Sequence, residues 1–314
     1  MRLALALLVL ACSVAQAQSF PTKPIRIVLG YSTGGTADNL GRVVAEKLTP
    51  VLGQTVLIDN RPGASGNIAA QAVSKATPDG HTLLFGNTAE MAINKHLMKD
   101  MGFNPDTDFA PVVLIHNVPL GLIVSAKSPY ASLKDLLDAA RRESGRLTFA
   151  NSGSGSPAHL ASEMLALKTG VTMTQVPYKG AAPALLDLIG GRVDAYFLGL
   201  PAVTPHVKGG NVRLLAVSTA KRATSAPDTP TVAELGIAGF DFSLWGGLFA
   251  PAGTPAEVVT TLNHAVTEVL TRPDIQAQMA REGSDVVRTT PEEFSRFVHA
   301  ESTKYGELLK SIKP

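Results

Sequence analysis

Two polar, glycine-containing segments hold the residues whose types and spacing could bind a small ligand. In the first segment and the helix that should follow it, the candidates are Tyr31, Ser32, Thr33, Gly34, Gly35 and Asp38. In the second segment and its following helix, they are Asn151, Ser152, Ser154, Gly155 and His159. Glycine lets a backbone approach a ligand closely, and the N-terminus of a helix carries a partial positive charge. Such a segment can hold a carboxylate without a lysine or an arginine.

Each segment follows a predicted strand and opens a predicted helix. Residues 25–31 indicate a buried strand, and the apolar residues within 40–51 recur with helical spacing. Residues 56–59 and 82–86 indicate further strands, with a small-residue helix over 65–75 between them. This alternation predicts an α/β protein with largely parallel sheets, which bind ligands at the carboxyl ends of their strands. We therefore expect the two segments to face one anion-binding cleft, although either could serve only as a tight turn.

Further residues at strand ends could line the same cleft. Asn87 and Thr88 end the third predicted strand and offer a neutral hydrogen-bonding pair. Tyr178 and Trp245 could form apolar walls, although aromatic residues at strand ends usually belong to the core. Asp38, in a first helical turn, could either stabilise the helix dipole or form a polar wall. A lone helical histidine such as His159 is more often a packing or capping residue than a ligand contact.

No pattern for catalysis or for a cofactor is complete. Residues 153–158 fit a G-x-G-x-x-A dinucleotide pattern, but the strand predicted over 173–178 ends without the acidic residue that would bind a ribose. There is no P-loop, no G-x-S-x-G nucleophile motif, and no pair of histidines at metal-ligand spacing. We therefore expect no catalytic residue, no metal and no cofactor, which argues against a secreted α/β hydrolase or transferase.

The N-terminus has the pattern of a secretory signal peptide. Arg2 precedes an apolar run too short to anchor in a bilayer, and residues 15–17 form a small-x-small cleavage site. Cleavage after Ala17 would deliver the chain to the periplasm and remove its only cysteine, Cys12, which fits a lipid-attachment site poorly. Loss of Arg2 would lower the formal charge by one, from +2 to +1, a balance that argues against nucleic acid as a partner. No later apolar run reaches about 18 residues, so the mature chain is expected to be soluble.

Two extended apolar stretches, over 112–126 and 240–250, are typical of a chain that crosses between domains. They predict a discontinuous first domain over 18–120 plus 242–314, with a second domain over 121–241 inserted into it. One polar segment then lies in each domain. A ligand that contacts both segments would favour a closed form of the protein.

Several longer motifs give the chain a family resemblance. In chain order they are PTKPIR at 21–26, NRPGASGN at 60–67, PDGHTLL at 78–84, DFAPV at 108–112, VPYKG at 176–180, PTVAE at 230–234 and APAGTP at 250–255. With these motifs, and with Gly34-Gly35 followed by Asp38, the chain resembles the Bug-type (TctC-like) substrate-binding proteins of tripartite tricarboxylate transporters. The resemblance runs through essentially the whole mature sequence.

The resemblance implies a periplasmic binding protein of type II-like α/β fold, with two lobes and a ligand cleft between them. It implies a monomeric, non-enzymatic receptor for a di- or tricarboxylate or an aromatic acid, which it delivers to the membrane permease subunits of a tripartite tricarboxylate transporter. The family's carboxylate contacts, some through water, would fall here on Tyr31, Thr33, Gly34, Gly35, Asn151, Ser152, Ser154 and Gly155. A receptor that presents its ligand to a membrane sensor kinase would share this fold and site, and is the alternative.

The chain departs from the family's pattern at two places. Residues 30–33 are Gly-Tyr-Ser-Thr, where the family usually has Pro-aromatic-Pro-Ala, and this difference predicts a more flexible and more polar first loop. Gly199 stands where the family commonly has Asp or Asn at the cleft. The missing side chain could admit a bulkier ligand, for example an aromatic acid.

Overall fold

The computed structural model describes residues 20–33, 36–153 and 155–311. Its strands are β1 (Ile25–Leu29), β2 (Val56–Asn60), β3 (Thr82–Asn87), β4 (Phe109–Ser125), β5 (Thr148–Asn151), β6 (Thr174–Pro177), β7 (Ala195–Gly199), β8 (Val212–Val217), β9 (Ser243–Pro251) and β10 (Asp285–Val286). Its helices are α2 (Thr36–Leu52), α3 (Asn67–Ser74), α4 (Asn94–Leu97), α5 (Leu133–Arg142), α6 (Pro157–Thr169), α7 (Ala181–Ile189), α8 (Leu200–Lys208), α9 (Ala256–Thr271), α10 (Pro273–Arg281) and α11 (Pro291–Ser311). A 3-10 turn, η1 (Ala64–Gly66), and a π-helical segment, η2 (Ala89–Ile93), complete the elements.

Several predictions fall outside these ranges. They are the signal peptide over 1–17 with Cys12, and the loop residues Gly34, Gly35 and Ser154. Within the ranges that the structure describes, no helix is both long enough and apolar enough to cross a membrane.

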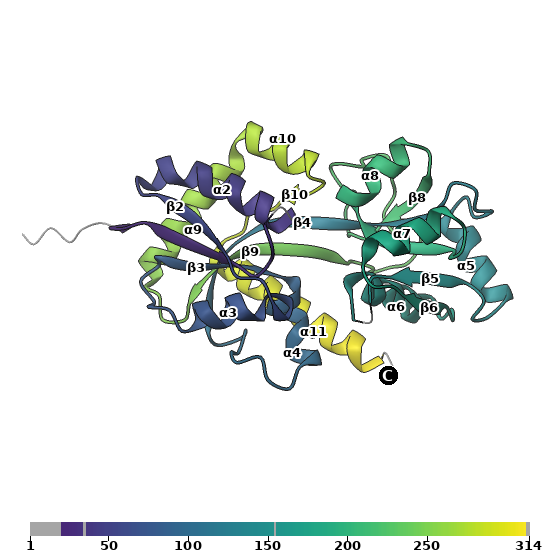
Figure 1. Cartoon of the computed structure of the whole chain (residues 1–314), viewed down its shortest axis with the longest axis horizontal. Coiled ribbons are helices and arrows are strands. Elements are labelled where there is room, and N and C mark those ends of the chain that lie inside the picture. The colour runs from purple at the N-terminus through teal and green to yellow at the C-terminus, as the bar shows by residue number, and fades with distance from the viewer. Residues whose placement is uncertain (1–19, 34–35, 154, 312–314) are drawn as a thin grey trace, which may run out of the picture.

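The strands form one sheet in the order β2-β1-β3-β9-β4-β7-β5-β6, with β8 and β10 paired to β4 outside this path. β1 is parallel to β2 and β3, and β5 is parallel to β6 and β7. The predicted α/β class is therefore confirmed. The prediction of largely parallel sheets is wrong, because β4 pairs antiparallel with β7, β8, β9 and β10, and β3 pairs antiparallel with β9. We call the half that contains β1, β2 and β3 lobe 1, and the half that contains β5, β6, β7 and β8 lobe 2 (Figure 1).

β4 and β9 run side by side from lobe 1 to lobe 2 (Figure 1). β4 pairs antiparallel with β9 as far as Pro119, opposite Ser243, and from Leu120 onward it pairs with β7 and β8. The apolar stretch predicted over 112–126 thus belongs almost entirely to β4, one strand of 17 residues. Two irregularities of register adjust its pairing with β9. The domain boundaries inferred from the sequence stay a prediction.

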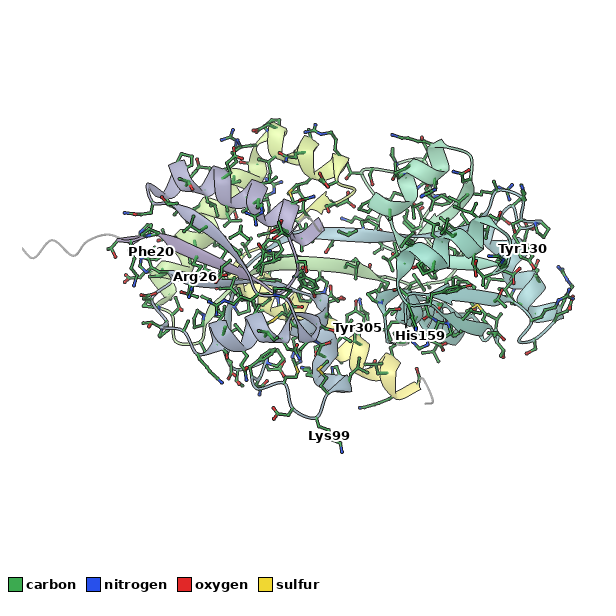
Figure 2. The ribbon with its side chains drawn as sticks, viewed as in Figure 1. Phe20, Arg26, Lys99, Tyr130, His159 and Tyr305 are labelled. Atoms are coloured by element: carbon green, nitrogen blue, oxygen red, sulfur yellow. The ribbon has the colours of Figure 1, made fainter. Side chains whose placement is uncertain are left out.

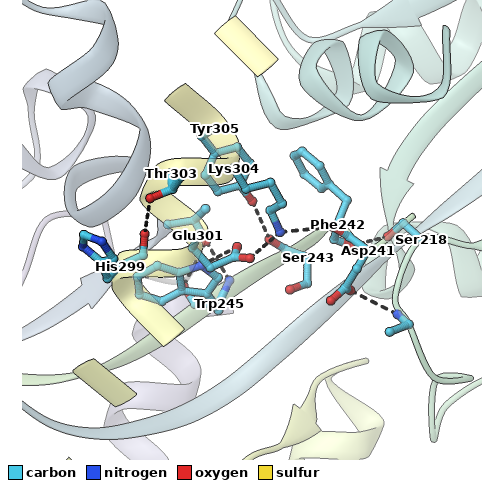
Figure 3. A network of polar contacts seen from close by, with 12 residues as sticks. Ser218, Asp241, Phe242, Ser243, Trp245, His299, Glu301, Thr303, Lys304 and Tyr305 are labelled. Carbon is cyan, nitrogen blue, oxygen red and sulfur yellow. Dashed lines mark hydrogen bonds and ion pairs between the residues drawn. The ribbon is translucent and has the colours of Figure 1, made fainter. Parts of the chain in front are cut away.

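Helix α11 braces the place where the chain enters β9. The ring of Trp245 in β9 packs edge-on against Phe294, with centroids 6.1 Å apart. Figure 3 shows the polar contacts of the same helix: the Trp245 Nε1–H donates to Oε2 of Glu301 at 3.1 Å, and Nζ of Lys304 donates to the carbonyl oxygen of Asp241 at 3.0 Å. Lys304 is also paired with Glu301. These contacts fix the position of Trp245 beside the crossing strands.

Candidate ligand-binding site

A cavity of about 760 Å³ lies beside the crossing strands and is lined by residues of both lobes. Seven of the predicted site residues line it: Tyr31, Asn87, Thr88, Ser152, Gly155, Gly199 and Trp245. The first three belong to lobe 1, the next three to lobe 2, and Trp245 to β9. Both predicted loops therefore reach the same cavity.

The first loop is held from behind by a buried carboxylate. Asp38 is 1 % exposed, and its Oδ2 accepts a hydrogen bond from Nε of Arg42 at 3.0 Å. Its Oδ1 accepts from Nδ2 of Asn60 at 2.9 Å, and the same amide donates to the carbonyl oxygen of Tyr31 at 3.0 Å. Asp38 thus positions the backbone of the loop and is not among the residues that line the cavity.

Behind Tyr31 lies Glu90, a fully buried carboxyl group. Its Oε2 accepts a hydrogen bond from the Tyr31 hydroxyl at 2.9 Å, and its Oε1 accepts from the Asn87 N–H at 2.9 Å. Burial raises the pKa of Glu90 from 4.5 to about 7, although these hydrogen bonds oppose the change. A group that can gain or lose a proton near neutral pH therefore lies directly behind two residues of the cavity wall.

Gly30 and Gly66 allow this arrangement because neither has room for a side chain. A Cβ atom on Gly30 would lie 2.5 Å from Cα of Gly66, and a Cβ on Gly66 would lie 2.7 Å from the carboxyl group of Glu90. Gly30 is itself buried. Close packing of two backbone segments explains the glycine at position 30 better than loop flexibility does.

The second loop uses several of its N–H groups internally. The Gly153 N–H donates to Oδ1 of Asn151 at 3.1 Å, and the Ser156 N–H donates to the Gly153 carbonyl oxygen at 3.0 Å. Gly153 and Gly155 have φ angles of +123° and +77°, which favour glycine. Ser152 and Ser156 both line the cavity, so their hydroxyl groups are donors that the described part of this loop can offer to a ligand.

His159 and Tyr178 support the second loop from outside the cavity. Nδ1 of His159 accepts from the Gly155 N–H at 3.0 Å, which places its own ring proton on Nε2, 3.7 Å from Oε1 of Glu163. Burial lowers the pKa of His159, and Glu163 opposes this change. The Tyr178 hydroxyl donates to Oδ2 of Asp187 at 2.9 Å. Figure 2 shows His159 at the edge of lobe 2 that lies nearest to α11.

Three helices begin at the cavity, so their partial positive charges act on it. Ala37 lies in the first turn of α2, Ser156 and Pro157 begin α6, and Gly199 precedes α8; all four line the cavity. Among the described lining residues there is no Lys, Arg, Asp or Glu. An anion bound here would be stabilised by helix N-termini and hydroxyl groups.

The rest of the described lining is mostly apolar. Its larger apolar side chains are Ile93, Leu97, Met98, Val118, Leu198, Leu244 and Trp245. In the described ranges, no group of three or more His, Cys, Asp or Glu side chains could hold a metal ion. The cavity is therefore suited to a ligand with a carbon skeleton and few polar groups.

Residues 40–313 match the family model described as tripartite tricarboxylate transporter family receptor. The chain belongs to this family. The resemblance seen in the sequence motifs is thus confirmed, and the family is one of periplasmic solute-binding receptors.

Relatives of known structure support the same fold. The R. palustris protein Rpa4515, solved with adipate, is 39 % identical and has a TM-score of 0.78 over 93 % of this chain and 97 % of its own. MatC from Rhodopseudomonas palustris, solved with bound malate, is 31 % identical and has a TM-score of 0.73 over 92 % of this chain and 99 % of its own.

The chain is also similar in sequence to Protein BugT of Bordetella pertussis, which is 35 % identical over 94 % of this chain and 90 % of its own length.

In this tripartite tricarboxylate transporter receptor, the residues predicted to contact the ligand occupy three kinds of position. Seven, including Trp245, line the cavity, while Asp38, Asn151, His159 and Tyr178 lie behind the loops and hold them through hydrogen bonds. Ser32 and Thr33 are exposed and are not among its lining residues, and Gly34, Gly35 and Ser154 lie outside the described residues. Contacts of all these residues with a ligand stay a prediction.

Some residues in or behind the wall of the receptor's cavity were not identified from the sequence. Glu90, behind the wall, was missed because its contact with Tyr31 joins residues 59 positions apart in the chain. His116 was not singled out, although a polar residue within a long apolar strand was an available signal. The apolar wall made by Ile93, Leu97 and Met98 was missed because it depends on how η2 and α4 turn after β3.

Proposed function

We propose that this receptor binds a small carboxylate in the cavity between its lobes and delivers it to the membrane permease subunits of a tripartite tricarboxylate transporter. The observation that carries the proposal is the convergence of three helix N-termini on a mostly apolar cavity with no acidic or strongly basic residue in its described lining. The relatives solved with adipate and with malate support a carboxylate ligand. The receptor acts as a monomer, exported with its signal peptide cleaved after Ala17.

In this proposal the ligand joins the two lobes. Its carboxylate contacts the hydroxyl groups of Ser152 and Ser156 on lobe 2, and its other end contacts lobe 1 beside Tyr31. The domains over 18–120 plus 242–314 and over 121–241 close around it by bending of β4 and β9. Closure follows from the ligand's contacts with both lobes, which are complete only in the closed form.

The first test is thermal unfolding of ligand-stripped mature protein with mono-, di- and tricarboxylates and with aromatic acids. A ligand present at a thousandfold its dissociation constant should stabilise the folded protein by about 4 kcal/mol, which gives a clear rise in Tm. Folded, empty protein that gives no rise in Tm with any of these acids would overturn the proposal.

Replacing Gly155 by valine should abolish the ligand-induced rise in Tm while the protein still folds. Position 155 lines the cavity and has a φ of +77°, which a β-branched residue adopts only with strain, so the loop must rearrange. Gly145→Val is the matched control, because Gly145 has a φ of +78°, open space around it and no place in the cavity lining. Both variants should lose some stability, but only Gly155→Val should lose binding. Native affinity in Gly155→Val would remove the second loop from the site.

Replacing Gly199 by asparagine should narrow the cavity without disturbing the fold. A Cβ at this position would meet Cδ of Pro201 at 3.7 Å and Cγ1 of Val118 at 3.8 Å, which are ordinary contacts. Isothermal titration calorimetry should show affinity for an aromatic acid falling by roughly tenfold or more, with a smaller change for a linear dicarboxylate. Gly199→Ala should have a weaker effect in the same direction. An equal loss for both classes of acid would show that Gly199 does not set the width of the site.

A further inference from the structure

His116 is a buried polar side chain at the cavity whose function the site described above does not explain. It lies in β4, is 3 % exposed and lines the cavity. Neither of its ring nitrogens has a hydrogen-bond partner within residues 20–33, 36–153 and 155–311. Its ring stacks on Phe85, with centroids 5.8 Å apart and an interplanar angle of 22°. Buried imidazoles are normally hydrogen-bonded, so these nitrogens indicate a missing partner.

His116 and Asn87 both pack closely against a glycine of the neighbouring strand. Gly246 of β9 is the register partner of His116, and a Cβ on Gly246 would lie 2.4 Å from Nε2 of His116 and 2.9 Å from Oδ1 of Asn87. Position 246 therefore has no room for a side chain, and the two polar atoms lie close to the same glycine and so close to each other. Both residues also line the cavity, so this pair of polar atoms belongs to the wall of the ligand site.

The orientation of the Asn87 amide is fixed by its neighbours. Its Nδ2 donates to the carbonyl oxygen of Phe85 at 3.2 Å and to Oε1 of Glu90 at 3.3 Å. Its Oδ1 is the atom that lies beside Gly246, where it can act only as an acceptor. His116 is neutral at neutral pH, because burial lowers its pKa to about 4, and a neutral imidazole offers one donor and one acceptor.

We propose that His116 and Asn87 form a subsite that binds a hydroxyl group at the far end of a hydroxy-substituted carboxylic acid. A hydroxyl group matches this pair because it can donate to Oδ1 of Asn87 and accept the ring N–H of His116 at the same time. A second carboxylate fits less well, since it can only accept, and it would approach both the Asn87 oxygen and the carboxyl group of Glu90. The inference rests on the proposed function, which places the first carboxylate at the second loop.

The test compares acids that differ only at their far end. Dissociation constants are measured for hexanoate, 6-hydroxyhexanoate and adipate, and for benzoate and 4-hydroxybenzoate, with the native protein and with His116→Phe. The native protein should bind a hydroxylated acid roughly tenfold more tightly than its parent, and His116→Phe should remove this preference. His116→Phe should unfold at a Tm equal to or above that of the native protein, because it replaces two unpaired buried nitrogens by carbon.

Two further variants separate binding from structure. Gly246→Ala removes neither polar group, but its Cβ would lie 2.4 Å from Nε2 of His116 and 2.9 Å from Oδ1 of Asn87 and must displace them, so it should also abolish the preference for the hydroxylated acid. His81→Phe is the control, because His81 is another buried histidine, but its Nε2 accepts from the Thr22 N–H at 3.2 Å and it is not part of the cavity lining. His81→Phe should lower Tm and leave the preference for the hydroxylated acid unchanged.

The outcomes distinguish this inference from the proposed function. If no carboxylate binds to the native protein, the proposed function fails and the subsite fails with it. If carboxylates bind but the native protein does not prefer a hydroxylated acid to its parent, only the subsite is overturned. Only the subsite is likewise overturned if His116→Phe keeps the preference for the hydroxylated acid, or if it lowers the affinities of parent and hydroxylated acid by the same factor.

Discussion

Replacing Glu90 by glutamine should stabilise the protein by about 3 kcal/mol at pH 8 and by almost nothing at pH 4. The carboxyl group is fully buried, and its pKa is raised from 4.5 to about 7. Below pH 4.5 it is protonated in both the folded and the unfolded chain, so its ionisation does not change the free energy of unfolding. Between pH 4.5 and 7 the unfolded chain loses this proton more readily, and the native protein therefore loses stability as the pH rises. Glutamine has no charge to bury, so the variant avoids this loss.

Urea unfolding of the native protein and of Glu90→Gln at intervals from pH 4 to pH 8.5 measures the effect. Glu257→Gln controls for the change from carboxyl to amide, since Glu257 is exposed in the first turn of α9. This substitution should change the free energy of unfolding by less than about 1 kcal/mol. His116, whose pKa is lowered by burial to about 4, is present in both proteins, so its effect on stability cancels in the difference between them. A stability difference between native and Glu90→Gln that is the same at every pH would contradict the prediction.

The same carboxyl group should make ligand binding depend on pH. An anionic ligand in the cavity adds a like charge near Glu90 and so favours its protonated form. Affinity of the native protein for a carboxylate should fall as the pH rises above about 7, where Glu90 becomes charged. Glu90→Gln should bind the same ligand with an affinity that changes little between pH 6 and pH 8.5.

Replacing Gly30 by alanine should destabilise the protein by about 1–3 kcal/mol and weaken ligand binding. The new methyl group would lie 2.5 Å from Cα of Gly66, and Gly66 has Glu90 on its other side. A backbone atom cannot turn aside as a flexible side chain can, so the two segments must separate. Tyr31 follows directly in the chain and lines the cavity, so the separation should reach the ligand.

Gly41→Ala is the matched control and should change the stability in the opposite direction. Gly41 lies inside α2, and a Cβ there would make ordinary contacts of 3.5 Å with side-chain atoms of Ile58 and Leu29. Alanine favours a helix over glycine by up to about 1 kcal/mol, so this variant should be more stable with unchanged affinity. Urea unfolding and calorimetric titration measure both variants. Gly30→Ala with the stability and affinity of the native protein would show that Gly30 and Gly66 are not packed as described.

Much of the fold follows from local sequence patterns. The strand predicted at 25–31 is β1, and the apolar positions within 40–51 belong to α2. Each pattern spans few residues and depends on the periodicity of one element, which burial of one face imposes directly. The two polar loops could be found for the same reason, because a strand end followed by glycine, serine and a helix start is a local signal. Residues just after those strands, such as Tyr31 and Ser152, do line the cavity.

The tertiary structure alone decided which polar residues face the cavity and which hold the loops. Asp38 and Asn151 are of residue types that often contact ligands, but both are buried and hydrogen-bonded to their own loops. Glu90 gave no local sign of lying at the site, and the polar character of His116 within an apolar strand did not show what the ring would contact. The contact of Glu90 with Tyr31 and the close approach of His116 to Gly246 depend on strand order and on the register of β4 with β9. Register is fixed by the packing of whole faces against one another, and such packing leaves no signature in the few residues around either position.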